Sequence, residues 1–226
     1  KDGRPSQPPV RIGKHEVSGE FNFPRLLAFP NPTSLLSVAQ SGEALTSDLT
    51  SAKPLFNVNA GQDKTFTVYR AAIADGKLAI ASTGPQVLLR AADGKMLRVL
   101  PLPKDSFPRS LALSKDGKKL AVGVGSARAA IAGQPRFYSE EHDHILIFEN
   151  PFEGNAEPKS IDHVGPAEAL AFHPVENRLA VAGGDADEVR LLDLANLKKP
   201  LSVIRGAGRR PWAVNLSEDG RVLGVR

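Results

Sequence analysis

Apolar residues recur along the chain in short alternating runs, two to a unit. The second run of each unit has the form Leu-x-Val or Leu-x-Ile, with its leucine at positions 36, 78, 120, 179 and 223. These leucines are 42, 42, 59 and 44 residues apart. A period of roughly 40–45 residues is typical of propeller blades, each a sheet of four strands. The pattern therefore predicts an all-β fold of repeated sheets.

The first run of each unit predicts the innermost strand of a blade. These strands are expected at residues 27–29, 71–73, 111–113, 170–172 and 214–216. Bulky and small residues alternate in most of them, which suits a strand buried between stacked sheets. Asp-Gly pairs at 75–76, 116–117 and 219–220 predict tight turns between the first and second strands.

Two further runs complete the unit. Third strands are predicted at 87–90, 145–148 and 189–193, with a weaker copy at 44–48. Fourth strands are predicted at 55–58, 97–100 and 201–204. Four antiparallel strands make a blade that must stack on its neighbours, because neither of its apolar faces is covered by the blade itself. The sequence thus predicts a β-propeller with four readable blades and half of a fifth.

One repeat carries a resemblance to a known family. Residues 162–194, DHVGPAEALAFHPVENRLAVAGGDADEVRLLDL, resemble a WD repeat, although Asp162 replaces the usual Gly and Leu192 the usual Trp. The resemblance extends over roughly residues 25–226 and implies a divergent WD-type propeller. It also implies structural hydrogen-bonding roles for matching side chains, namely His163, Asp185, Asp187 and Asp193.

The two ends of the chain need separate treatment. Residues 1–24 are interpreted as an N-terminal extension, in which residues 10–17 could supply an outer strand to a later blade. The fifth unit has only two readable strands, and an incomplete sheet exposes unpaired edges. We therefore expect the chain to be part of a longer or cleaved polypeptide, and the remainder of that polypeptide is a candidate partner.

Composition excludes several classes of function. Cysteine is absent, so there are no disulfides or thiolate metal sites, and no apolar run of about 18 residues predicts a membrane span. The net charge of +4 is a modest excess over 25 acidic residues and does not indicate nucleic-acid binding. The compartment is left open, with the cytoplasm favoured. Catalytic and nucleotide-binding motifs are also absent, so we predict no catalytic residue and no cofactor.

An insertion lengthens the third blade. It runs approximately over residues 125–143, between the second and third strands of that blade. Insertions on rigid scaffolds often carry function, and Arg and Tyr are favoured interface residues. The candidate partner contacts here are Arg136, Phe137 and Tyr138, and the alternative is a tolerated, solvated decoration. His142 and His144, which are separated by one residue and lie among carboxylates, are weak candidates for metal ligands, with a solvated charged tract as the alternative.

Arginines recur just before the predicted inner strands. Arg25, Arg70 and Arg109 occupy this place in successive units, and the fifth unit has Arg209, Arg210 and Trp212 there. Together they could line one end of the central channel and bind an acidic peptide or another anion. The alternative is that these arginines only solvate the rim.

These observations favour a non-catalytic interaction module, a regulatory or scaffolding propeller that binds a partner protein or acidic peptide through its rim and loops. The resemblance adds that some multidomain bacterial proteins join WD-type repeats to an effector such as a protease or kinase. Two alternatives stay open: a propeller hydrolase or lyase with a site at the central channel, and a structural subunit completed by a second chain.

Overall fold

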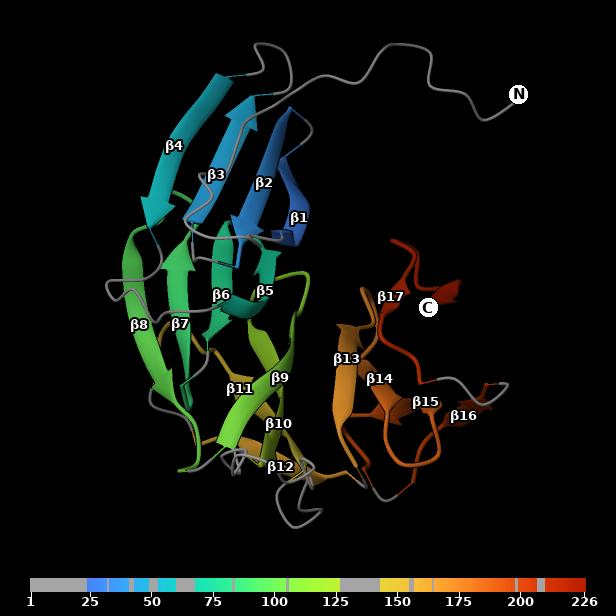
Figure 1. Ribbon diagram of the computed structural model, residues 1–226. Helices are drawn as coiled ribbons and strands as arrows, with labels where there is room; N and C mark the ends of the chain where they lie inside the picture. Colours follow the sequence, from blue (N-terminus) through green and yellow to red (C-terminus); the bar gives the residue numbers. More distant parts are fainter. Residues whose placement is uncertain are drawn as a thin grey trace, which may run out of the picture. The chain divides into compact units, whose positions relative to one another are not determined.

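The fold is described from a computed structural model, shown in Figure 1. The structure describes residues 24–31, 33–40, 43–48, 53–59, 68–82, 84–104, 106–126, 143–154, 157–163, 165–197, 199–206 and 210–226. These residues form strands joined by turns and loops, without a helix. Within them there is accordingly no helix of the length and apolarity needed to cross a membrane.

The chain divides into two compact units, Lys1–Thr67 and Val68–Arg226. The described part of the N-terminal unit is one antiparallel sheet whose strands pair in chain order. Its strands are β1 (Pro24–Asn31), β2 (Ser34–Ala39), β3 (Glu43–Asp48) and β4 (Lys53–Asn59). Leu36 and Val38 of β2 are buried, as the alternating pattern requires.

Three more four-stranded sheets make up most of the C-terminal unit. The first has β5 (Val68–Ala74), β6 (Lys77–Ser82), β7 (Gln86–Ala91) and β8 (Met96–Pro101). The second has β9 (Ser106–Leu113), β10 (Lys119–Ser126), β11 (His144–Glu149) and β12 (Lys159–Asp162). The third has β13 (Ala167–Phe172), β14 (Arg178–Gly183), β15 (Glu188–Asp193) and β16 (Ser202–Arg205). We number the blades in chain order, so these are blades two, three and four.

Each blade is an antiparallel meander in which neighbours in sequence are neighbours in the sheet. A two-stranded sheet of β17 (Val214–Leu216) and β18 (Leu223–Val225) follows as the described part of blade five. The predicted fold class, an all-β propeller of four-stranded antiparallel blades, is confirmed. The predicted strands fall inside observed ones, except that residue 201 precedes β16, and the possible outer strand at 10–17 lies outside the described residues. β12 is a fourth strand that the sequence pattern did not reveal.

The core of the C-terminal unit lies between successive blades. One apolar cluster joins blade two to blade three and includes Leu89, Leu120 and Phe148. A second joins blade three to blade four and includes Ile147 and Leu179. Blade three therefore buries both of its faces against its neighbours, which is how stacked repeats obtain a continuous core.

The turn between the first two strands is built in the same way in blades three and five. In blade three the Ser114 hydroxyl donates to Asp116 Oδ1 at 2.7 Å, and that oxygen also accepts from the Lys118 N–H. Gly117 follows with a positive φ of 65°, a conformation that Gly adopts without strain. In blade five Ser217 and Asp219 repeat the hydroxyl–carboxylate bond at 2.6 Å.

Candidate partner-binding surface

The inner strands of the C-terminal unit are neighbours in space. β9 contacts both β5 and β13, and β17 contacts β13. Residues near the start of these strands are therefore brought to one end of the unit, although successive starts are 38 to 61 residues apart in sequence. Arginines were expected just before these strands, whereas Arg25, Arg70 and Arg109 lie inside β1, β5 and β9.

Each inner strand of a complete blade contains a β-bulge near its start. In β5, Val68 pairs with Ser82 and Arg70 with Ala81, so Tyr69 is the extra residue. The register skips one residue in the same way at Arg109 in β9, at Glu168 in β13 and at Arg25 in β1. A bulge turns its extra side chain away from the regular alternation of the strand.

Blade five has the same feature just ahead of β17. The N–H groups of Trp212 and Ala213 both donate to the Arg226 carbonyl, at 2.7 and 3.3 Å, so two residues oppose one. Within the C-terminal unit the bulge position is thus held by Tyr69, Arg109, Glu168 and Trp212. We call these four residues the bulge row.

Contacts between blades connect the members of the bulge row. The rings of Tyr69 and Phe107 lie 6.3 Å apart, and the Arg109 guanidinium lies over the Phe107 ring at 4.7 Å. Arg109 Nη1 is 3.6 Å from Glu168 Oε1, and Arg210 Nη1 approaches the same oxygen at 3.5 Å. The two guanidinium groups therefore share one carboxylate, across three blades.

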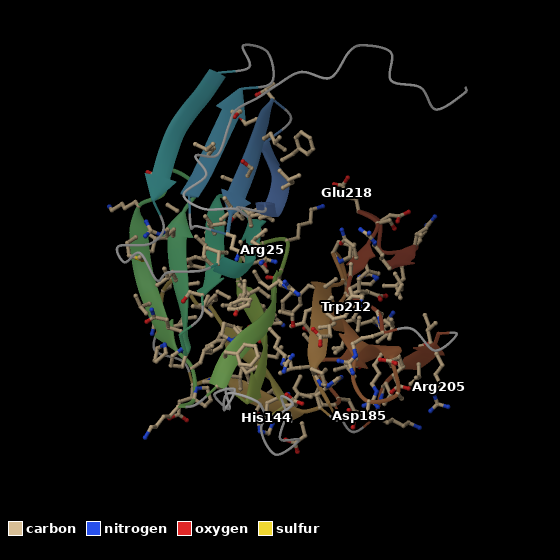
Figure 2. All side chains as sticks on the ribbon, viewed as in Figure 1. Arg25, His144, Asp185, Arg205, Trp212 and Glu218 are labelled. Atoms are coloured by element: carbon tan, nitrogen blue, oxygen red, sulfur yellow. The ribbon has the colours of Figure 1, made fainter. Side chains whose placement is uncertain are left out.

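The middle of the row is buried and its ends are exposed. The side chains of Arg109 and Glu168 are only 9% and 6% exposed, whereas Trp212 is 60% exposed and Tyr69 is 38% exposed. Figure 2 labels Trp212 near the inner strands of this unit. A buried ion pair holds its charges at fixed places, while the exposed aromatic rings at the ends are available to a partner.

A second acidic group, Asp143, lies close to Arg109. Asp143 is buried, and its Oδ1 has no hydrogen-bond partner among the described residues. Burial raises the pKa of Asp143, the Arg109 charge opposes that rise, and the nearby Asp185 and Glu168 add to it. A Cβ at Gly125 would lie 2.4 Å from Arg109 Nε and 3.0 Å from Asp143 Oδ1, so glycine makes room for both side chains.

The remaining arginines predicted for this surface have separate settings. Arg25 belongs to the N-terminal unit, where its Nη2 donates to Gln40 Oε1 at 2.8 Å. Arg70 Nη1 donates to the Tyr69 carbonyl at 3.0 Å. Arg210 also places its Nε 3.3 Å from Asp187 Oδ1. The insertion residues Arg136, Phe137, Tyr138 and His142, together with Arg209, lie outside the described residues.

The residues matched to the WD repeat make local contacts in blade four. His163 is buried with Nδ1 2.7 Å from the Gly165 carbonyl, and burial lowers its pKa, which favours the neutral ring with Nδ1–H as donor. Asp193 Oδ1 accepts from the Ala195 N–H at 2.9 Å. Asp185 lies against Gly165, where a Cβ would be 2.3 Å from Asp185 Oδ1.

His144, the other weak metal candidate, begins β11 with Nδ1 3.3 Å from Asp162 Oδ1. Over the part of the chain that the structure describes, no three or more His, Cys, Asp or Glu side chains are gathered as a metal site would need.

Three residues in or beside the bulge row were not predicted from the sequence: Tyr69, Glu168 and Asp143. Glu168 was within reach, because it lies four residues before Phe172 just as Arg109 lies four before Leu113. Tyr69 was missed because the neighbouring Arg70 was aligned with Arg25 and Arg109. The bulge places Tyr69, and not Arg70, at the position equivalent to theirs. The burial of Asp143 depends on neighbouring blades and has no local signature.

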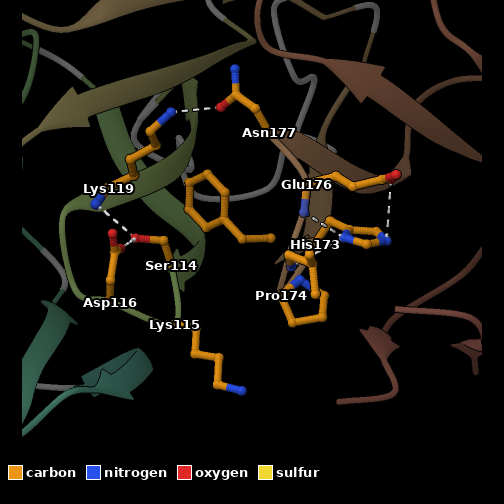
Figure 3. A pocket seen from close by; sticks show the side chains of 10 residues that line it. Ser114, Lys115, Asp116, Lys119, His173, Pro174, Glu176 and Asn177 are labelled. Atoms are coloured by element: carbon orange, nitrogen blue, oxygen red, sulfur yellow. Dashed lines mark hydrogen bonds and ion pairs between the residues drawn. The ribbon is translucent and has the colours of Figure 1, made fainter. Parts of the chain in front are cut away.

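A separate hollow of about 370 Å³ lies at the other end of the inner strands (Figure 3). It is bounded by the turn after β9 and the turn after β13. Lys119 Nζ bonds Asn177 Oδ1 across it at 2.6 Å, and His173 Nε2 lies 3.6 Å from Glu176 Oε2. The Lys119–Asn177 bond therefore links blades three and four across the hollow, while the His173–Glu176 pair lies within one turn of blade four.

Comparison with known proteins adds no assignment. No protein-family model matches the chain, and no curated protein matches its sequence. The resemblance to WD repeats therefore stays a prediction, and function has to be inferred from the geometry.

Proposed function

We propose that the chain is a non-catalytic interaction module that binds a segment of a partner protein across the bulge row. The observation that carries this proposal is the convergence of Arg109 and Arg210 on Glu168, next in the row to the exposed Trp212. Trp, Tyr and Arg are the residue types that contribute most binding energy in interfaces, and here they gather on the inner strands β5 and β9 and just ahead of β17.

An acidic peptide fits this surface best. The Arg210 guanidinium has five N–H donors in a fixed fork, and its two acidic neighbours, Glu168 and Asp187, approach only Nη1 and Nε. A carboxylate of the partner can approach Arg210, whose side chain is 36% exposed, while apolar parts of the peptide cover Trp212. The Arg109–Glu168 pair is a positioning element, since both side chains are buried.

Peptide selection tests this proposal without requiring an identified partner. A phage library of random linear peptides is selected on the full chain, and the enriched peptides are then synthesised and titrated. We expect sequences rich in Asp and Glu whose affinity falls about tenfold or more in the Trp212→Ala and Arg210→Ala variants.

Val175→Ala is the matched control, because Val175 is a 76% exposed apolar residue in the turn between β13 and β14, away from the bulge row. This variant should bind the selected peptides as the unchanged protein does. Failure to enrich any peptide, or peptides that bind equally well after Trp212→Ala, would contradict the proposal.

A further inference from the structure

Two arginines share a buried carboxylate on the third and fourth strands of blade four. Glu188 begins β15, and its side chain is only 3% exposed. Arg190, two residues further along β15, donates from its Nε to Glu188 Oε1. Arg205, the last residue of β16, donates from its Nε to Glu188 Oε2 at 3.2 Å. Each oxygen of the carboxylate therefore accepts from one Nε–H group.

The two guanidinium groups keep most of their hydrogen-bond donors. A guanidinium has five N–H donors, and the bond from Nε to Glu188 leaves those on both Nη atoms. Within the described part of the chain, no other acidic side chain pairs with Arg190 or Arg205.

The charges of this group do not cancel. Burial acts to raise the pKa of Glu188, but the hydrogen bonds and charges of Arg190 and Arg205 outweigh it and lower the pKa, so the carboxylate stays ionised. Two positive charges and one negative charge leave an excess of one positive charge. A single carboxylate of a ligand would neutralise that excess.

Pairing between β15 and β16 places the group on one face of blade four. Glu188 is opposite Arg205, and Arg190 is opposite Val203. Side chains opposite one another in a sheet, and those two residues apart on a strand, point to the same side. Leu192, the next residue on that side of β15, belongs to the apolar cluster shared with blade three. The arginines and Val203 therefore lie on the face of blade four that is turned toward blade three.

This face is exposed at β16 even though a complete blade stands beside it. The Arg205 side chain is 77% exposed, the Arg190 side chain is 30% exposed and Val203 is 41% exposed. Blade five packs against the opposite face of blade four, so its two-stranded form does not cause this exposure. Figure 2 labels Arg205 beside β16, well apart from Trp212 of the bulge row.

We propose that Arg190 and Arg205 bind a carboxylate of an extended partner segment, which lies along β16 and covers Val203 with an apolar side chain. Arginine binds carboxylates through pairs of parallel N–H bonds, and the excess charge matches one such group. A segment along β16 presents every second side chain to this face, so an acidic and an apolar residue two positions apart fit it. No residue of this site belongs to the bulge row, so the inference goes beyond the proposed function and can fail independently of it.

A pair of blocked pentapeptides tests the ligand chemistry. The probe is acetyl-Thr-Glu-Thr-Val-Thr-amide, and its control has Gln in place of Glu. In NMR spectra of the isotopically labelled full chain, the probe should shift the Nε–H signals of Arg190 and Arg205 and the amide signal of Val203 in a saturable manner. The control should bind about fivefold more weakly or worse, because a neutral amide does not match the excess charge.

Matched protein variants locate the site. Arg205→Gln should weaken binding of the probe about fivefold or more, and Arg205→Lys should also weaken it, because lysine keeps the charge and loses the planar fork. Arg221→Gln is the control, since Arg221 lies between β17 and β18 with its side chain 86% exposed and loses the same charge. Equal melting temperatures of these variants will show that the fold is intact.

Four results would overturn the proposal. Equal weakening by Arg205→Gln and Arg221→Gln would show only general charge attraction. Equal weakening by Arg205→Gln and Arg210→Ala would place the probe on the bulge row. Inorganic phosphate that shifts the Arg190 and Arg205 signals at lower concentration than the probe would assign the arginines to a phosphate ligand. Shifts that grow with protein concentration in the absence of probe would assign this face to a second copy of the chain.

Discussion

The second strands of blades three and five have the same Leu-x-Val pattern and different surroundings. In β10, Leu120 and Val122 are both 0% exposed. In β18, Leu223 is half-buried and Val225 is 48% exposed. Both strands pair with their inner strand, and both begin after the same Ser-x-Asp-Gly turn.

The difference between these strands comes from what lies beside them. Local pairing and the turn are intact in blade five, so they do not require a complete sheet. Burial of the second strand does require the third strand of its own blade and the faces of its neighbours. In a stacked repeat the core forms between neighbouring repeats. An apolar strand sequence is therefore not sufficient to bury that strand.

The largest expected change in stability comes from truncating the equivalent leucines, Leu120 and Leu223, to alanine. Leu120→Ala leaves a cavity among fully buried neighbours and should lower the free energy of unfolding by about 2–5 kcal/mol. Leu223→Ala removes a half-buried side chain at a groove and should lower it by less than about 1 kcal/mol. Urea unfolding measures both, and equal losses would show that β18 is buried in solution.

A smaller change in stability is expected from substituting the residue that follows each leucine, and its sign differs between the two strands. Ala121 is fully buried, so Ala121→Val overpacks the core and should lower the free energy of unfolding by about 1–3 kcal/mol.

Gly224 is exposed, and a Cβ there would meet nothing closer than the Asn215 carbonyl at 3.9 Å. Gly224→Val should therefore raise the melting temperature slightly, because it restricts the unfolded chain and favours a strand. A lower melting temperature for Gly224→Val would indicate that β18 is already covered.

The smallest expected change in stability appears over only part of the pH range. Blade three holds Asp143, whose pKa is raised chiefly by burial, so its charged form is disfavoured in the folded protein. This contribution makes the fold more stable as the pH falls through the folded pKa toward the unfolded value of about 3.9. Asp143→Asn should be more stable than the unchanged protein at pH 8, with a difference that shrinks on acidification.

Asp116 in the same blade is the control for this measurement. The Ser114 hydroxyl and the Lys118 N–H lower the pKa of Asp116, so its contribution is present above the unfolded pKa and is lost as the pH falls through the folded pKa. Asp116→Asn should therefore be less stable than the unchanged protein at pH 8. Thermal unfolding of both variants is measured at several pH values. If both were more stable, or both less stable, than the unchanged protein at pH 8, the electrostatic account would be contradicted.

The fold could be predicted because its signals are local and repeated. The Leu-x-Val or Leu-x-Ile run occurs in five copies, three of which follow an Asp-Gly turn, so each copy supports the interpretation of the others. β12 was missed because its four residues, Lys159–Asp162, have only one buried apolar side chain, Ile161. Its strand character depends on pairing with β11 and not on its own pattern.

The candidate surface could be predicted only in part. Arg109, Arg210 and Trp212 were found from their place ahead of the inner strands, since topology brings strand starts together. The compensation of the two arginines by Glu168 and Asp187 was not foreseen, because a repeat alignment gives position and not the direction in which a side chain points. That direction depends on the bulge, which inserts one residue into the register.

The bulge also has a consequence for how this surface can change over time. An extra residue outside the ladder has no partner opposite it, so its identity is not constrained by cross-strand packing. Arginine, tyrosine, glutamate and tryptophan all occupy the position in this one chain. Substitutions at the exposed positions, Tyr69 and Trp212, can therefore change this surface one blade at a time while the strand ladder stays the same.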